Sequence, residues 1–265
     1  MNEMKAQGLG TTSAPSDGRH LRLAAVADIH CARTSRGKLR PLFAQMAEEA
    51  DVLLLGGDLT DYGLPEEARI LAQELKEAGP SQVIAVLGNH DYHSDKAEEL
   101  KDILIASGIK VLDGDVVEVK GVGFTGVKGF MGGFDKRILQ AWGEPTIKLI
   151  VRECMEEAMK LESALASLRT SQRIVLMHYS PIHATVSGEP PEIVPFLGSS
   201  RLEEALHRQK VTAVFHGHAH FGSPEGRTIN DVPVYNVAMP LLKRQYPKRP
   251  PFRTFDLQHR VDRAK

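Results

Sequence analysis

Short apolar runs alternate with amphipathic stretches through the first 110 residues, and this alternation restricts the fold more than any other feature. The apolar runs contain almost no polar residue, as strands buried on both faces do, whereas the stretches between them repeat apolar residues at helical spacing. The expected strands are residues 21–27, 52–57 and 83–88, and the expected helices are residues 39–50, 65–79 and 95–108. Alternating β and α elements predict a sheet of parallel strands with helices packed on its faces.

The second half of the chain continues this pattern with one interruption. Residues 110–130 contain short β-like runs broken by glycine, which predict hairpins. Residues 146–169 form one long helical pattern, with Ile150, Met155 and Leu165 among the residues of its apolar face. Further strands are expected at residues 173–178, 211–216, 233–238 and 252–257, and a further helix at residues 199–209.

Composition and charge exclude several classes of protein. Charged residues make up 25% of the 265 residues and the formal net charge is -1, so neither nucleic acid nor a membrane is an expected partner. Residues 1–19 lack the apolar segment of a secretory signal, and we expect a flexible leader there before a single domain over residues 20–265. The two cysteines, Cys31 and Cys154, are too few for a disulfide framework, which predicts a cytoplasmic location.

Polar residues follow five of the predicted strands at the point where each strand ends. Because the carboxyl ends of parallel strands form the ligand-binding edge of an α/β sheet, these residues are expected to converge on one site. They are Asp28 and His30, Asp58, then Asn89, His90 and Asp91, then His178, and finally His216, His218 and His220. A single Asp or His after a strand is usually a turn residue or a surface residue, but the joint pattern favours a shared site.

The residue types at these positions point to metal ions. Imidazole and carboxylate without a well-placed thiolate are ligands for borderline divalent metals such as Mn, Fe, Ni or Zn. The segment HGHAH, residues 216–220, places histidines at alternate positions with only Gly217 and Ala219 between them. Two of these imidazoles could reach separate metal ions while the small spacers keep the backbone close.

Five motifs in register resemble those of the calcineurin-like metallophosphoesterases, in a compact form without a large cap domain. They are Asp28-x-His30, Gly57-Asp58, Gly88-Asn89-His90-Asp91, His178 and Gly217-His218-Ala219-His220. The resemblance covers about residues 21–240. It implies a four-layer α/β/β/α sandwich with two mixed sheets and a metal site at the C-terminal ends of the strands.

The resemblance also implies roles for individual residues in a site for two divalent metal ions. Asp28, His30 and His220 would bind the first ion, Asn89, His178 and His218 would bind the second, and Asp58 would bridge them. A hydroxide shared by both ions would attack the phosphorus atom of a small phosphoester. His90 would donate a proton to the leaving group, with Asp91 orienting its ring, and His216 would support the ligands from behind.

Three functions are compatible with these motifs. The leading one is hydrolysis of phosphoric monoesters or diesters, a cyclic nucleotide or another small diester included. A protein-interaction scaffold on the same fold would not need His90 beside the metal ions. A nuclease would need a basic stripe for the phosphate backbone, and the chain shows none.

Some local signals fit structural roles better than functional ones. GVGFTG, residues 121–126, matches a dinucleotide fingerprint, but a glycine-rich stretch follows it where that fingerprint requires a helix. Cys31 is expected to face the core, because neighbouring side chains of an extended segment point in opposite directions. The basic run 241–253 predicts a solvated segment leading into a strand, with attraction of an anionic substrate as the alternative.

Overall fold

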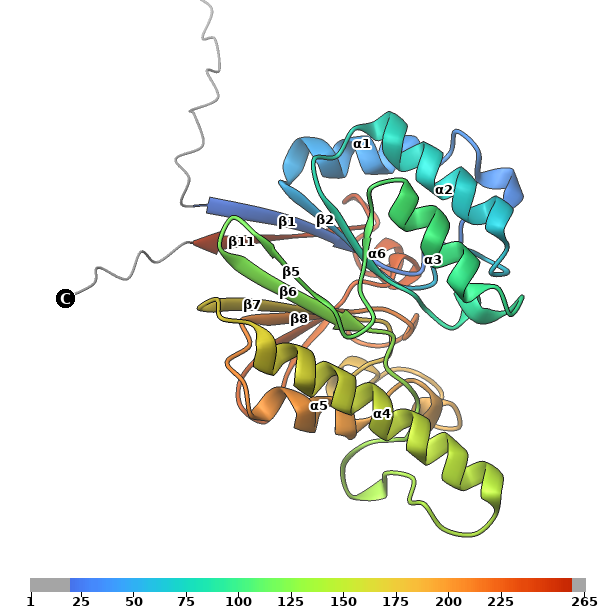
Figure 1. Ribbon diagram of the computed structural model, residues 1–265, viewed down its shortest axis with the longest axis vertical. Coiled ribbons are helices and arrows are strands. Elements are labelled where there is room, and N and C mark those ends of the chain that lie inside the picture. The colour runs from blue at the N-terminus through green and yellow to red at the C-terminus, as the bar shows by residue number, and fades with distance from the viewer. Residues whose placement is uncertain (1–19, 259–265) are drawn as a thin grey trace, which may run out of the picture.

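The computed structural model describes residues 20–258, in which two β-sheets pack face to face between outer layers of helices (Figure 1). The first sheet has five strands in the order β11-β1-β2-β3-β4, all parallel except β11. Its strands are β1 His20–Val26, β2 Val52–Gly56, β3 Val83–Val86, β4 Lys110–Val111 and β11 Arg253–Gln258.

The second sheet has six strands in the order β5-β6-β7-β8-β10-β9, with antiparallel strands at both edges. Its strands are β5 Val116–Val119, β6 Val122–Val127, β7 Gln172–Met177, β8 Ala213–His216, β9 Glu225–Arg227 and β10 Pro233–Asn236. The hairpin expected within residues 110–130 is the antiparallel pair of β5 and β6. The two mixed sheets with flanking helices confirm the predicted fold class.

Helices cover the outer face of each sheet (Figure 1). The first sheet carries α1 Arg40–Glu49, α2 Pro65–Ala78 and α3 Ala97–Ala106, and the second carries α4 Pro145–Ser167 and α5 Ser200–His207. The start and stop expected for α2 are confirmed: Pro65 occupies its first turn, and Gly79 caps it with a left-handed φ of 72°. In this part of the chain, residues 20–258, no helix is long and apolar enough to span a bilayer.

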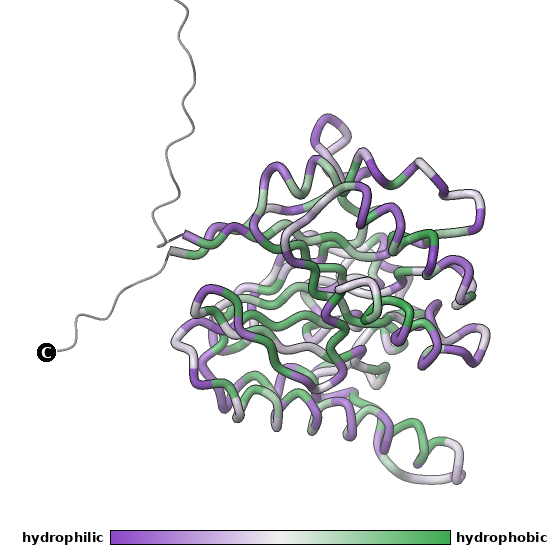
Figure 2. The backbone as a smooth tube through the Cα atoms, turned by 45° about the horizontal axis from the view of Figure 1, so that its top comes forward, coloured by the Kyte–Doolittle hydropathy of each residue, from purple (hydrophilic) through white to green (hydrophobic). Residues whose placement is uncertain are grey.

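Three large apolar clusters fill the core, and residues 23–26 of β1 show why a buried strand is continuously apolar. Ala24 and Val26 belong to the cluster under α1–α3, whereas Leu23 and Ala25 belong to the cluster between the two sheets. Alternate residues of a strand point to opposite faces, so a strand covered on both faces needs apolar residues throughout. Figure 2 shows this arrangement as hydrophobic strands inside and more hydrophilic helices outside.

The basic run 241–253 differs from its prediction. Its first residues form part of α6, Met239–Gln245, rather than a solvated leader. Leu241 and Leu242 are buried in this helix, and Leu242 joins the cluster between the sheets. Packing of these leucines against residues far away in the sequence stabilises the helix here, and the local spacing of apolar residues does not predict it.

Candidate metal centre

The loops that follow β1, β2, β3, β7 and β8 meet where the carboxyl ends of the two sheets come together. Backbone hydrogen bonds join neighbouring loops within each sheet: the Asp28 amide donates to the Gly57 carbonyl at 3.0 Å, and the Gly217 amide donates to the His178 carbonyl at 3.1 Å. The His218 amide links the two sheets by donating to the Asp28 carboxylate at 3.0 Å. All nine predicted site residues lie in these loops and are buried or half-buried. The convergence inferred from strand ends is therefore present in the fold.

Asp28, His30 and His220 form one group whose possible ligand atoms lie within 4.8 Å of one another. His220 Nε2 is 2.9 Å from Asp28 Oδ1. Burial raises the pKa of Asp28, but the hydrogen bond from His220 and the charge of nearby histidines outweigh burial and lower that pKa to about 2. Burial also lowers the pKa of His30. The hydrogen bond to Asp28 raises the pKa of His220. A metal ion binds the ionised carboxylate and the neutral form of both imidazoles, so its binding would displace the proton shared by His220 and Asp28.

Asp58, His178 and His218 form a second group with the same spacing. Burial lowers the pKa of His218 to about 3, so this ring is neutral. Asn89 joins the group through its side-chain oxygen, which lies 2.9 Å from His178 Nε2. The four residues come from the loops after β2, β3, β7 and β8.

The ring of His178 shows what the second group requires. Its Nδ1 lies 3.0 Å from the Gly56 carbonyl oxygen and donates to it, so in the neutral ring Nε2 presents a lone pair. That Nε2 is 2.9 Å from Asn89 Oδ1 and 3.3 Å from Asp58 Oδ1. Three acceptor atoms therefore face one another, and a cation among them would satisfy all three. The donor set fits a divalent metal ion of the borderline class.

Asp58 stands between the two groups. Its Oδ1 is 3.3 Å from His178 Nε2, and its Oδ2 is 3.9 Å from His30 Nε2. Each carboxylate oxygen thus faces a histidine of a different group. Asp58 is also almost fully buried, and its Oδ1 accepts the backbone N–H of His90 at 2.8 Å. A carboxylate held in this way has one oxygen directed toward each group of possible ligands.

The backbone that carries these side chains is strained. Asp28, His30, Asp58 and His218 all have positive φ, between 46° and 69°. Residues other than glycine rarely adopt this region, and such strain gathers at functional sites. The spacer Gly217 has a separate reason to be glycine, because a Cβ atom there would collide with the Asp28 carboxylate and with the side chain of Ala27.

Asp91 does not hold the ring of His90, so the role expected for it is wrong. His90 Nδ1 lies 2.7 Å from the backbone carbonyl oxygen of Asp61 instead. Asp91 is fully buried and accepts hydrogen bonds from Thr60 and Gly88, which belong to two different loops. Burial and the charge of Asp58 raise the pKa of Asp91 to about 6. Asp91 therefore holds the loops after β2 and β3 together, because its carboxylate accepts hydrogen bonds from donors in both loops.

Asp61 is a residue of the site that the sequence analysis missed. Its carbonyl oxygen meets His90, and its Oδ1 lies 3.5 Å from His30 Nδ1. His30, Asp61 and His90 form a third group with metal-ligand spacing. The available signal was a second aspartate three positions after Asp58, on the same loop.

His216 and Cys31 both lie behind the loops. His216 is fully buried, with Nε2 2.8 Å from the Thr185 hydroxyl and Nδ1 2.8 Å from the Gly217 carbonyl. Burial lowers the pKa of His216 to about 4. Its role in supporting the metal ligands stays a prediction. Cys31 is buried in the cluster under α1–α3, which confirms the prediction that it faces the core.

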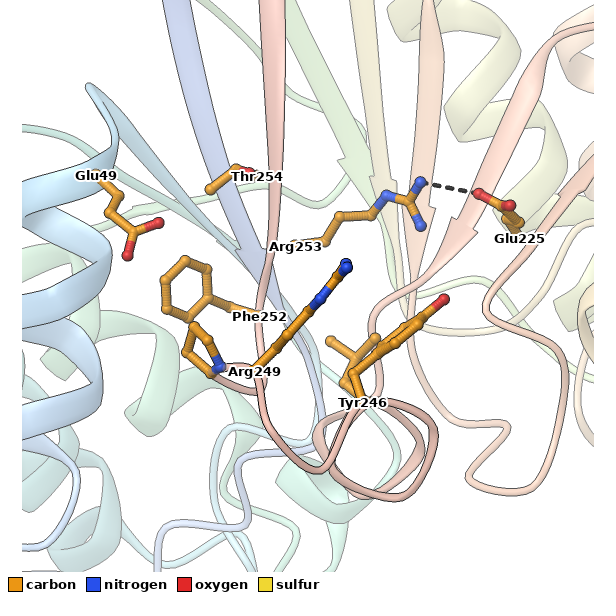
Figure 3. Close-up of a pocket in the computed structure, with 9 residues that line it drawn as sticks. Glu49, Glu225, Tyr246, Arg249, Phe252, Arg253 and Thr254 are labelled. Atoms are coloured by element: carbon orange, nitrogen blue, oxygen red, sulfur yellow. Dashed lines mark hydrogen bonds and ion pairs between the residues drawn. The ribbon is translucent and has the colours of Figure 1, made fainter.

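A cavity of about 400 Å³ lies apart from the metal-type groups, where α6 leads into β11 (Figure 3). The end of the basic run 241–253 lines it. Arg253 donates to Glu225 at 2.8 Å and lies 3.9 Å from the centre of the Tyr235 ring, so its charge is already paired. Among the described residues, none of the predicted ligands lines this cavity.

The fold and its clustered aspartate, asparagine and histidine residues define a metallophosphoesterase. Residues 21–222 match the sequence model of the calcineurin-like phosphoesterases, and the chain belongs to that family. This confirms the resemblance seen in the motifs. No curated protein matches the sequence.

Solved structures of similar length share the fold. The phosphopantetheinyl hydrolase PptH from Mycobacterium tuberculosis has a TM-score of 0.64 at 17% identity, over 90% of this chain and 96% of that chain. The protein TT1561 of Thermus thermophilus has a TM-score of 0.53 at 14% identity, over 91% and 99% of the two chains. At these identities the likeness concerns the fold alone.

Proposed function

We propose that this protein is a hydrolase of phosphoric esters that uses two divalent metal ions. The observation that carries the proposal is the position of Asp58, whose two carboxylate oxygens face histidines of two separate groups. Asp28, His30 and His220 would hold one ion, and Asn89, His178 and His218 would hold the other. Family membership and the acceptor-rich geometry support this assignment.

The side chains of the site divide the chemistry between them. When bound, two such ions polarise phosphoryl oxygens and lower the pKa of water toward neutrality. His90 is half-buried, its ring centre lies 4.5 Å from that of His30, and the Asp61 carbonyl oxygen accepts from its Nδ1. Its Nε2 is left to deliver a proton to the leaving oxygen, a role worth about 10²–10⁴ in rate. Asp61 thus positions the ring that Asp91 was expected to position.

The test separates metal binding from proton transfer. Wild-type protein is stripped with a chelator, reloaded with Mn, Ni or Fe, and assayed with 4-nitrophenyl phosphate and its bis-ester. Asp58→Ala is expected to lose both the bound metal and the activity, because the shared carboxylate is gone. His90→Ala is expected to keep its metal content and to lose about 10²–10⁴-fold in kcat.

Metal content measured on the purified variants decides the roles. Two tightly bound ions in Asp58→Ala would show that Asp58 does not bridge. Loss of metal from His90→Ala would make His90 a ligand together with His30 and Asp61. A wild-type protein that hydrolyses neither ester with any of the metals would contradict the hydrolase itself and would favour the scaffold function.

A further inference from the structure

A cleft of about 410 Å³ opens beside the second group of ligands. Its volume lies in the range of about 300–1,000 Å³ that is typical of small-molecule sites. Asn89, a proposed ligand, forms part of its lining, and so does Tyr179. The Tyr179 ring lies 4.5 Å from the ring of His218 and 5.5 Å from that of His178, measured between centres. The cleft therefore adjoins the proposed metal centre.

One part of the lining of this cleft is apolar. Phe130, Leu149 and Ile150 line it, the last two from the first turns of α4. Figure 1 shows this end of α4 extending beyond the rest of the second layer of helices. Leu149 is 52% exposed, whereas Leu161 and Leu165, farther along the same helix, are fully buried. An apolar wall left open beside a polar centre fits a ligand with an apolar part.

The charge in the cleft is balanced. Lys128 is the only cation among the described residues that line it, and its Nζ lies 4.0 Å from Glu153 Oε1. The same Nζ donates to the Gly129 carbonyl at 2.8 Å and lies 4.5 Å from the centre of the Phe130 ring. Burial lowers the pKa of Lys128, although the charges of nearby glutamates oppose this shift. The cleft thus offers no unpaired positive charge for a second phosphate group.

We propose that this cleft binds the organic group that is esterified to the phosphoryl group of the substrate. The enzyme would select phosphoesters in which this organic group is uncharged and apolar. Aromatic and aliphatic groups are uncharged and apolar, whereas the organic parts of sugar phosphates and polynucleotides are polar or charged. The proposal rests on the proposed hydrolase function, since it places the phosphoryl group at the metal centre. Its specific claim is that Phe130 and Leu149 determine which ester is preferred.

The test compares phosphate monoesters of three primary alcohols, 2-(1-naphthyl)ethanol, octanol and ethanol, whose alkoxides are similar leaving groups, and the methyl diester of each. The wild-type enzyme is expected to prefer the naphthylethyl or the octyl ester to the ethyl ester by about tenfold or more in kcat/KM, the scale of apolar pocket contacts. Comparison of kcat/KM for the naphthylethyl and octyl esters shows whether the cleft prefers an aromatic ring or an alkyl chain. Leu149→Ser and Phe130→Ala are each expected to reduce this preference about tenfold.

Met159→Ser is the matched control, because Met159 is another exposed apolar residue of α4, 64% exposed, that does not line the cleft. It is expected to keep the wild-type preference. If the enzyme hydrolyses all three esters equally well, or if Leu149→Ser and Met159→Ser behave alike, the cleft proposal is wrong and the hydrolase stands.

A binding measurement tests the cleft even if the protein hydrolyses none of these esters. Calorimetric titration with 2-(1-naphthyl)ethylphosphonate, octylphosphonate and ethylphosphonate is expected to show tighter binding of the first or the second, and to lose that difference in Leu149→Ser. Such binding without hydrolysis of any ester would uphold the cleft and contradict the hydrolase. Equal binding of all three would overturn the cleft proposal on its own.

Discussion

Replacing Asp91 by alanine tests whether the loops of the centre depend on a buried brace. The Asp91 carboxylate accepts from the Leu59 amide at 3.2 Å, the Thr60 amide at 2.8 Å and the Thr60 hydroxyl at 2.6 Å. It also accepts from the Gly88 amide at 2.8 Å. The first three donors follow β2 and the last follows β3, so one side chain ties together the loops that carry Asp58 and Asn89.

The magnitude follows from these donors. Alanine would leave three backbone N–H groups without their acceptor, while the hydroxyl of Thr60 can rotate toward another. A buried donor left unpaired costs about 1–3 kcal/mol. Water entering the vacated space satisfies part of this loss. We therefore expect Asp91→Ala to lower the free energy of unfolding by about 3–5 kcal/mol, the lower part of the summed range.

Urea denaturation of the metal-free protein measures this change, and metal content measures its effect on the centre. Asp102→Ala is the control, because Asp102 is an exposed aspartate of α3, and a change within about 0.5 kcal/mol is expected for it. Asp91→Ala should also bind metal more weakly although no proposed ligand is removed. Equal stability of the two variants would refute the bracing role of Asp91.

Three other changes probe separate parts of the molecule. Gly217→Ala adds a Cβ against the Asp28 carboxylate, so its metal content should fall, and a full complement by metal analysis would contradict this. Glu157→Ala removes the buried acceptor of the Gly129 amide at 2.7 Å, which should cost about 1–3 kcal/mol in urea denaturation. Phe43→Ala empties a fully buried site under α1 and should cost about 3–5 kcal/mol in the same assay.

The elements of the fold were largely predictable because their signals are local. The strand β1 is recognisable because residues 23–26 are buried on both faces and are all apolar. The ends of α2 are recognisable because proline and glycine suit the first turn and the left-handed cap. The helix α6 was missed because burial of Leu241 and Leu242 depends on strands far away in the chain.

The long helix α4 shows the same limit within a single element. Its helical spacing predicted one apolar face for core packing, and Leu165 is buried as expected. Met155 is nevertheless 47% exposed, and Ile150 lines the cleft instead of the core. The periodicity of a helix identifies its apolar face, but only the neighbouring layers decide how much of that face they cover.

By itself, the sequence determined the kind of chemistry available to this protein: carboxylate, amide and imidazole groups at the ends of parallel strands, in the register of a known family. Tertiary structure alone decided how these groups face one another. It brought the amide of His218 to 3.0 Å from the carboxylate of Asp28, 190 positions away, and turned Asp91 from the ring of His90 toward the loop amides. The physical reason is that hydrogen-bond partners are chosen by distance in the folded chain, and the packing of the two sheets sets that distance.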